Sequence, residues 1–219
     1  MKLFLVLLLL LATETKLTLS VDKEALPATL SKNLQPLLAP QSFRVNDASG
    51  QALLTFWIRK EIPLEATKDQ IENGVTYREV VPGSLIGCLE VHQQWTDFRK
   101  QTIKPGVYTL RLAIQPMTGD HEGTAPHQDF CLLCPVEKDI SVEAVGLEKL
   151  VQLSSKVTGT AHPSVMLLFP VKKLAELKEP KLEEPMTSVQ TLVLVRDAAA
   201  EKMKTQIGFA FTVEGVRKD

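Results

Sequence analysis

The sequence predicts an all-β chain that folds as an antiparallel β-sandwich, with one short amphipathic helix packed on it. Two observations favour this class. Roughly nine short apolar segments are separated by links rich in Gly, Pro, Asn and Asp. One segment only has helical periodicity, so the chain lacks the alternation of strands and helices that a parallel sheet requires. A length of 219 residues suits one domain, which we expect over residues 15–219.

The composition supports a packed domain and excludes other classes. Hydrophobic residues make up 44% and charged residues 23%, values typical of globular proteins rather than of disordered or coiled-coil chains. The 25 Lys and Arg are balanced by 26 Asp and Glu, for a net charge of -1. Because the chain has no broad excess of basic residues, we expect no nucleic-acid partner.

The first residues have the pattern of a secretory signal. Lys2 precedes the apolar run 3–11, and polar residues follow Ala12. A helix that spans a bilayer needs about 20 apolar residues, more than twice the length of this run. We therefore expect residues 1–14 to be a signal peptide, the protein to be exported to the periplasm or the extracellular space, and no transmembrane anchor to remain.

Alternating apolar residues predict the first strands. Residues 17–21 alternate with a period of two, as in a strand with one buried face. Three prolines mark the segment 23–40 as a long connection with room for a short helical turn. Residues 42–45 and 52–59 flank an Asn-Asp-Ala-Ser-Gly loop, which predicts a hairpin.

Two Pro-Gly pairs delimit the next strands. Residues 75–81 and 85–91 are predicted strands, separated by the turn at 82–83. The pair at 105–106 has the pattern of a type II turn and precedes residues 107–114, a strand with clear alternation.

A buried strand, a helix and a further strand follow. Residues 129–134 are apolar and precede Pro135. Residues 141–157 change to helical periodicity and end before Gly159, which is typical of a helix C-terminus. Residues 164–169 predict another apolar strand.

The last part of the chain predicts a charged excursion and a hairpin. Residues 171–185 are charged and contain prolines, so we expect them to be exposed to solvent. Residues 189–195 and 207–213 form the final pair of strands, joined by a connection over 196–206.

Three cysteines, Cys88, Cys131 and Cys134, are too few for a disulfide scaffold. In an extended segment, residues three apart point to opposite faces and their Cα atoms lie about 10 Å apart, beyond the ~7 Å limit for a disulfide. We therefore expect Cys131 and Cys134 not to pair with each other. A bridge from Cys88 to one of them is the more plausible pairing.

Potential metal ligands are concentrated around the predicted strand at 129–134. The cluster consists of Asp120, His121, Glu122, His127, Asp129, Cys131 and Cys134. Imidazole, carboxylate and thiolate are all ligands of divalent metal ions. The other interpretation is a rigid loop whose carboxylates accept backbone hydrogen bonds and whose cysteines belong to the core. For the metal site, the candidate ligands are His121, His127, Asp120, Asp129 and His162.

No complete catalytic motif is present. The sequence contains no GxSxG nucleophile elbow and no GxGxxG or Walker loop for phosphate. We expect no cofactor, and our first hypothesis is a non-enzymatic binding or scaffolding module whose partner is an envelope protein or polymer. The alternative is a metal-binding protein, hydrolytic or redox, that uses the five candidate ligands and a divalent ion.

Three motifs resemble those of a known family. They are PGVYTLR at 105–111, GDHEGTAPHQDF at 119–130 and GTAHP at 159–163. Together they resemble a family of uncharacterised exported proteins known mainly from planctomycete-type bacteria. The resemblance implies a signal peptide and assigns no activity. Cys131 and Cys134 depart from the aliphatic residues usual in that family, which counts against a function for the CxxC pair.

Overall fold

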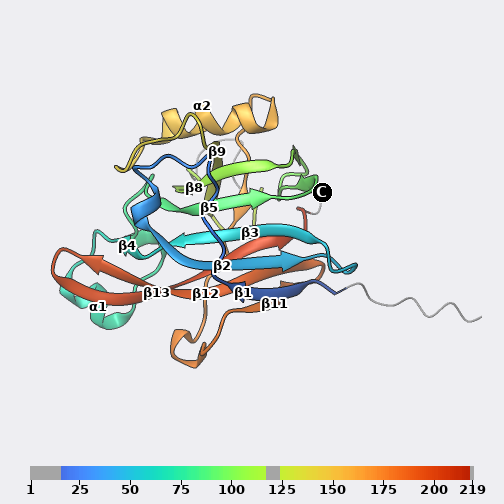
Figure 1. Cartoon of the computed structure of the whole chain (residues 1–219). Coiled ribbons are helices and arrows are strands. Elements are labelled where there is room, and N and C mark those ends of the chain that lie inside the picture. The colour runs from blue at the N-terminus through green and yellow to red at the C-terminus, as the bar shows by residue number, and fades with distance from the viewer. Residues whose placement is uncertain (1–15, 117–123, 218–219) are drawn as a thin grey trace, which may run out of the picture.

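The chain is mostly β in the computed structural model, which describes residues 16–116 and 124–217 (Figure 1). Strand accounts for 45% and helix for 14%, which confirms the mostly β class expected from the sequence. The predicted signal peptide at 1–14 lies outside the described residues, so its prediction is not tested. No helix in the described ranges has the length and apolar composition needed to span a membrane.

The elements follow one another along the chain in an order dominated by strands. The strands are β1 (Thr18–Asp22), β2 (Leu38–Asn46), β3 (Ala52–Arg59), β4 (Glu61–Pro63), β5 (Leu85–Val91), β6 (Trp95–Thr96), β7 (Thr102–Ile103), β8 (Gly106–Ile114), β9 (Asp129–Pro135), β10 (Met166–Leu167), β11 (Lys181–Met186), β12 (Val189–Ala200) and β13 (Met203–Glu214). The helices are α1 (Lys68–Asn73) and α2 (Leu147–Thr158), and short 3₁₀ turns occur at Gln35–Leu37, Tyr77–Glu79 and Leu174–Glu176.

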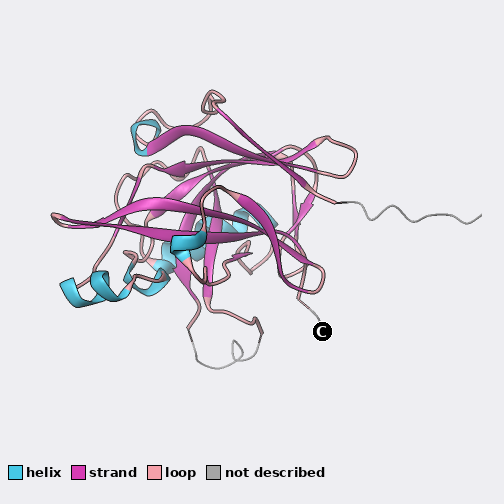
Figure 2. Cartoon of the chain, turned by 90° about the horizontal axis from the view of Figure 1, so that it is seen from below, coloured by secondary structure: helices cyan, strands magenta, loops and turns pink. Residues whose placement is uncertain are grey.

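Seven strands form a large antiparallel sheet in the order β1-β2-β3-β5-β8-β9-β10. This sheet is curled into a half-barrel. A second sheet contains β11, β12 and β13, with β4 added in parallel to β12. The arrangement therefore differs from the predicted sandwich of two simple layers in the curl of its larger sheet. Seen from below, strands make up most of the body (Figure 2).

The main core lies between the two sheets. The rings of Phe56 in β3 and Phe211 in β13 lie 5.5 Å apart between centroids, and Phe209 stacks on Phe211 at 5.3 Å. At the β10 end the sheets are also joined through the backbone, because Phe169 N–H donates to the Ala210 carbonyl at 3.0 Å. This shared core makes the two sheets one packed unit.

The outer face of the large sheet is covered by two further segments. In β9, Cys131 and Leu133 point into the main core, whereas Leu132 points outward, as the period of two requires. Helix α2 covers this part of the outer face. Residues 26–38 cover another part, where Leu30 and Leu34 pack against Trp57.

Two expectations about the middle of the chain are wrong. Residues 75–81 do not form a strand, because Thr76 and Glu79 form a capping box that begins a 3₁₀ turn. The helix predicted over 141–157 begins at Leu147 instead. A second helix, α1, which the sequence did not predict, begins with the capping box of Thr67 and Gln70.

The last third of the chain contains more strand than expected. The charged segment 171–185 is largely exposed, as predicted, but it ends in β11, which pairs with β12. The predicted connection 196–206 continues both strands of the final hairpin, with Asp197 opposite Gln206. Ala198 and Ala200 alternate into the interior, so this segment buries one face although its side chains are small.

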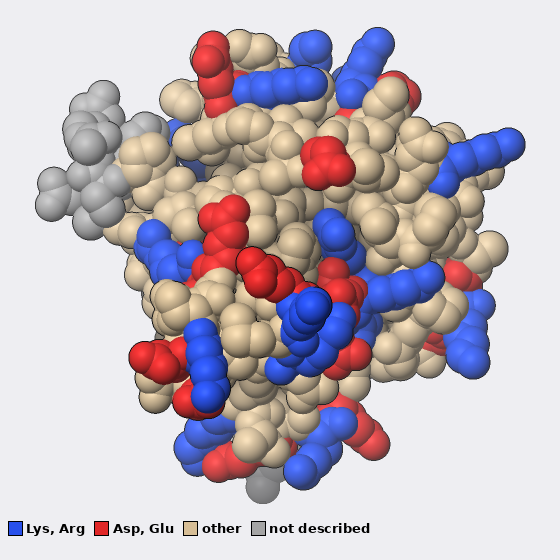
Figure 3. Space-filling view, turned by 90° about the vertical axis from the view of Figure 1, so that its left-hand side faces the viewer, with Lys and Arg blue, Asp and Glu red and all other residues tan. Residues whose placement is uncertain are grey.

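Charges of both signs are mixed on the surface. On the face drawn in Figure 3, Lys and Arg lie among Asp and Glu. This distribution agrees with the net charge of -1 and provides no extended basic area on that face.

Candidate functional site

A cavity of about 320 Å³ lies between α2 and the outer face of the large sheet. Most of the surface that lines it is apolar. The apolar side chains that define it are Phe98, Ala113, Phe130, Leu132, Val151 and Val165. Its volume and lining fall in the range typical of sites that bind small molecules.

A small residue of the large sheet, Ala113, lines the cavity. Ala113 in β8 lies directly opposite Phe130 in β9, and its methyl group leaves space beneath the helix. Helix α2 is anchored farther along by Leu150 and Leu153, and by a hydrogen bond of 2.9 Å between the Ser154 and Ser164 hydroxyls. The helix therefore packs tightly along part of its length and spans the cavity elsewhere.

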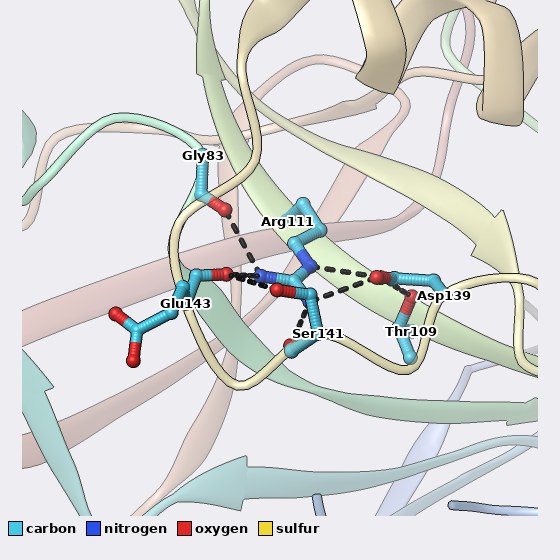
Figure 4. A network of polar contacts seen from close by, with 6 residues as sticks. All are labelled: Gly83, Thr109, Arg111, Asp139, Ser141 and Glu143. Atoms are coloured by element: carbon cyan, nitrogen blue, oxygen red, sulfur yellow. Dashed lines mark hydrogen bonds and ion pairs between the residues drawn. The ribbon is translucent and has the colours of Figure 1, made fainter.

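A buried ion pair fixes the segment that leads into α2 (Figure 4). Arg111 has an exposed fraction of 0%, and its Nε and Nη2 donate to the two carboxylate oxygens of Asp139, each at 2.8 Å. Thr109 donates its hydroxyl proton to the same carboxylate. Such bidentate pairing is the strongest common form of a side-chain ion pair.

The same guanidinium also holds the backbone of the following loop. Arg111 donates to the carbonyls of Glu143 at 2.8 Å and Gly83 at 3.1 Å, and to that of Ser141. These carbonyls are oriented toward Arg111 and do not begin a helix, which explains why α2 starts at Leu147. Arg111 thus positions the N-terminus of α2 above the cavity.

Several polar side chains lie at the edge of the cavity. Gln115 donates to the Thr124 hydroxyl at 2.9 Å, which joins the segment after β8 to the segment before β9. His162 lies exposed at another edge. Arg99 and Arg217 supply two guanidinium groups, and the described lining includes no carboxylate.

The C-terminal strand brings Arg217 to the cavity. The Arg217 N–H donates to the Phe98 carbonyl at 2.9 Å, so the backbone of Arg217 lies beside the segment that contains Phe98 and Arg99. The Nε of Arg217 is buried and has no hydrogen-bond partner in the described part of the chain. Because a buried donor without a partner is destabilising, an acceptor that reached this nitrogen would stabilise the arrangement.

The structure does not bring the described metal candidates together. His127 packs edge-on against the Phe169 ring at 4.9 Å, and Asp129 lies 3.5 Å from the Arg78 guanidinium. His162 lines the cavity below α2, whereas His127 lines a separate hollow beside the charged segment. The described residues contain no group of three or more His, Cys, Asp or Glu that could hold a metal ion. Asp120 and His121 lie outside the described ranges, so for them the metal site stays a prediction.

Burial shifts the pKa values of His127 and Asp129. It lowers the pKa of His127 and raises that of Asp129, while the charge of Arg78 counteracts the latter shift. His127 packs on Phe169 and Asp129 lies beside Arg78, but Oδ1 of Asp129 is buried without a hydrogen-bond partner in the described residues. This oxygen therefore does not accept the backbone hydrogen bond that the interpretation of a rigid loop expects.

The three cysteines are free and buried. Cys88 and Cys134 both pair with Thr109, from opposite sides of β8, so β8 separates them by two strand spacings, about 9.6 Å. That distance exceeds the reach of a disulfide, and the expected bridge from Cys88 to Cys134 is wrong. Cys131 lies farther along β9 and points into the main core.

Burial also suppresses thiol reactivity. It raises the pKa of Cys134 to about 12, and it raises the pKa values of Cys88 and Cys131 as well. All three thiols are therefore protonated at neutral pH and behave as small apolar side chains.

The sequence reasoning did not identify the cavity or the buried ion pair. Arg111 falls in the strand predicted over 107–114, but its partner Asp139 is 28 residues away and no short motif connects them. An arginine at an alternating position of an otherwise apolar strand is the one signal that points to such a partner.

Comparison with family models, curated proteins and solved structures finds no match. The resemblance to exported proteins of planctomycete-type bacteria therefore stays a prediction.

Proposed function

We propose that this protein is a non-enzymatic binding module that holds a small, mostly apolar molecule in the cavity beneath α2. The observation that carries this proposal is the apolar-lined cavity of about 320 Å³. Concave, preformed and mostly apolar sites with a few polar groups at their edge are typical binding sites for small ligands.

The volume limits the size of the ligand. At about 30 Å³ for each water-sized group, a cavity of 320 Å³ holds roughly ten non-hydrogen atoms. A bicyclic aromatic molecule or an alkyl chain of similar size meets this limit. Larger ligands require part of the molecule to extend past the cavity edge.

Preorganisation of the walls supports a role in binding. The Arg111–Asp139 pair and the contacts of Leu150 and Leu153 hold the helix above the sheet. Because the cavity needs little ordering when the ligand enters, more of the contact energy is available for affinity.

We also propose that binding takes place after export, on the strength of the signal-like residues 1–14. The frame, two packed sheets with one curled, is related to the sandwich expected from the sequence. The predicted envelope protein or polymer partner is a separate proposal, for which the cavity provides no support.

The test is a titration of the full chain with naphthalene-2-carboxamide, a neutral bicyclic probe of about the right size. We expect a dissociation constant of about 1 mM or tighter, from about 0.3 kcal/mol for each non-hydrogen atom. Methyl NMR signals of Ala113 and Val151 should shift, because both side chains line the cavity.

A matched pair of variants localises the binding. Val151→Phe places an aromatic ring in the cavity and should weaken binding of the probe by at least tenfold. Gln152→Phe adds the same ring to an exposed position on the same helix and should leave affinity unchanged. Equal affinity for both variants, with both folded by thermal unfolding, would exclude this cavity as the binding site.

A further inference from the structure

The charged groups among the described lining residues of the cavity beneath α2 are all positive. Among its described lining residues are two guanidinium groups, those of Arg99 and Arg217, and no carboxylate. No ion pair is formed by either group with a described acidic residue. Two cations that no described carboxylate neutralises, beside apolar walls, favour an anion.

Asp97 is the acidic residue closest to Arg99 in the chain, and its carboxylate is occupied. Its Oδ1 accepts hydrogen bonds from the backbone N–H groups of Arg99 at 2.9 Å and Gln101 at 2.8 Å. Its Oδ2 accepts from the Gln101 side chain and from Val165 N–H, both at 2.9 Å. Asp97 therefore fixes the backbone at the cavity edge, and the Arg99 side chain forms no ion pair with it or with another described carboxylate.

Arg217 provides the second, independent observation. Its backbone is held against Phe98 at 2.9 Å, and its Nε is buried without a hydrogen-bond partner in the described residues. Since burial of an unpaired guanidinium nitrogen is costly, an acceptor from a ligand would stabilise this arrangement.

We propose that the ligand of this cavity is an organic acid, whose carboxylate binds between Arg99 and Arg217 and whose apolar body lies against Ala113 and Leu132. This inference rests on the proposed function and adds the chemical class of the ligand. Guanidinium groups suit it because each offers paired N–H donors that match the two oxygens of a carboxylate.

The test compares two ligands of nearly the same shape, naphthalene-2-carboxylate and naphthalene-2-carboxamide, on the full chain at neutral pH. We expect the acid to bind about tenfold tighter than the amide, because the two arginines contribute charge-assisted hydrogen bonds. The preference should shrink as salt concentration rises, since Arg99 is partly exposed.

Variants assign the preference to the two side chains. Arg99→Gln and Arg217→Gln should each lower affinity for the acid by about threefold to tenfold, and the double variant should remove the preference. The amide should bind all of them equally. Lys104→Gln, an exposed position outside the cavity lining, removes one positive charge and should leave the preference intact. Arg99→Lys keeps the charge and should retain part of it.

The outcomes separate this inference from the proposed function. Equal affinity for acid and amide would overturn the organic-acid ligand and leave the apolar cavity as a binding site. A preference that is unchanged in the double variant would also overturn it. If neither compound binds, both proposals fail.

Discussion

The outer face of the large sheet is covered in two places, and the two covers differ in how completely they fill the space beneath them. Under residues 26–38, Leu30 and Leu34 pack directly on Trp57, whose indole N–H donates to the Glu24 carbonyl at 3.2 Å. Under α2, a cavity remains, and Ala113 is one of the side chains that line it. The alternation of the strands is the same in both places, so the two places differ in how completely side chains fill the space between sheet and cover.

The two covers also differ in how they are held. Residues 26–38 are held mainly by apolar side chains, whereas the segment leading into α2 is held by hydrogen bonds to Arg111. A polar anchor fixes the helix without filling the space below it. This difference is what allows an open site on an otherwise well-packed sheet, and it can be tested directly.

The largest effect should come from Asp139→Ala. The substitution leaves the guanidinium of Arg111, with an exposed fraction of 0%, without its carboxylate. We expect the free energy of unfolding to fall by about 3–5 kcal/mol, the usual cost of a broken buried ion pair, as measured by urea denaturation. Affinity for the naphthalene probes should fall as well, because α2 loses its anchor.

Glu72→Ala is the matched control for this prediction. It breaks the exposed ion pair with Lys68 in α1 and should change stability by less than about 0.5 kcal/mol. A loss of under about 1 kcal/mol in Asp139→Ala would show that backbone contacts alone suffice to hold the loop.

Truncating one leucine in each covering segment compares the two regions. Leu34→Ala removes a side chain with an exposed fraction of 0% from the filled region and should cost about 3 kcal/mol. Leu147→Ala acts at the cavity edge, where the side chain is 44% exposed, and should cost less than about 0.5 kcal/mol. Equal losses in denaturant unfolding would contradict the difference in packing between the two regions.

Local patterns predicted the strands whose apolar residues contrast with polar neighbours. β5 and β8 lie where the sequence placed them, since each follows a Pro-Gly turn and carries large apolar side chains. The segment 75–81 was assigned wrongly, although the spacing of Thr76 and Glu79 is the signature of a capping box. The Ala-rich continuation of β12 was not predicted, because the hydropathy of alanine contrasts little with that of its polar neighbours.

The cavity depends on contacts between residues distant in the chain, and no local pattern encodes these. Arg111 meets Asp139 across a strand and a loop, and Arg217 reaches Phe98 from the end of the chain. The sequence around Ala113 does not distinguish it from other strand residues, and its position in the cavity wall follows from the placement of α2. The sequence therefore led only to the hypothesis of a binding module, and the position of the proposed site required the tertiary structure.

The smallest effect should come from protonation of His127, whose ring packs on that of Phe169. Burial lowers its pKa in the folded state below the usual 6.5, so the unfolded chain binds a proton first as the pH falls. Stability should therefore decrease from about pH 7 to about pH 5.5, by about 0.3 kcal/mol because the side chain is only partly buried.

His127→Gln isolates this contribution, since the difference in unfolding free energy between the two pH values should shrink by the same amount in the variant. Burial raises the pKa of Asp129, so its protonation favours the folded state as the pH falls and opposes the effect of His127. A wild-type protein that becomes more stable between pH 7 and 5.5 would mean that the attraction of Asp129 for the charged imidazole outweighs the cost of burial, and that the loop tolerates a cation beside β9.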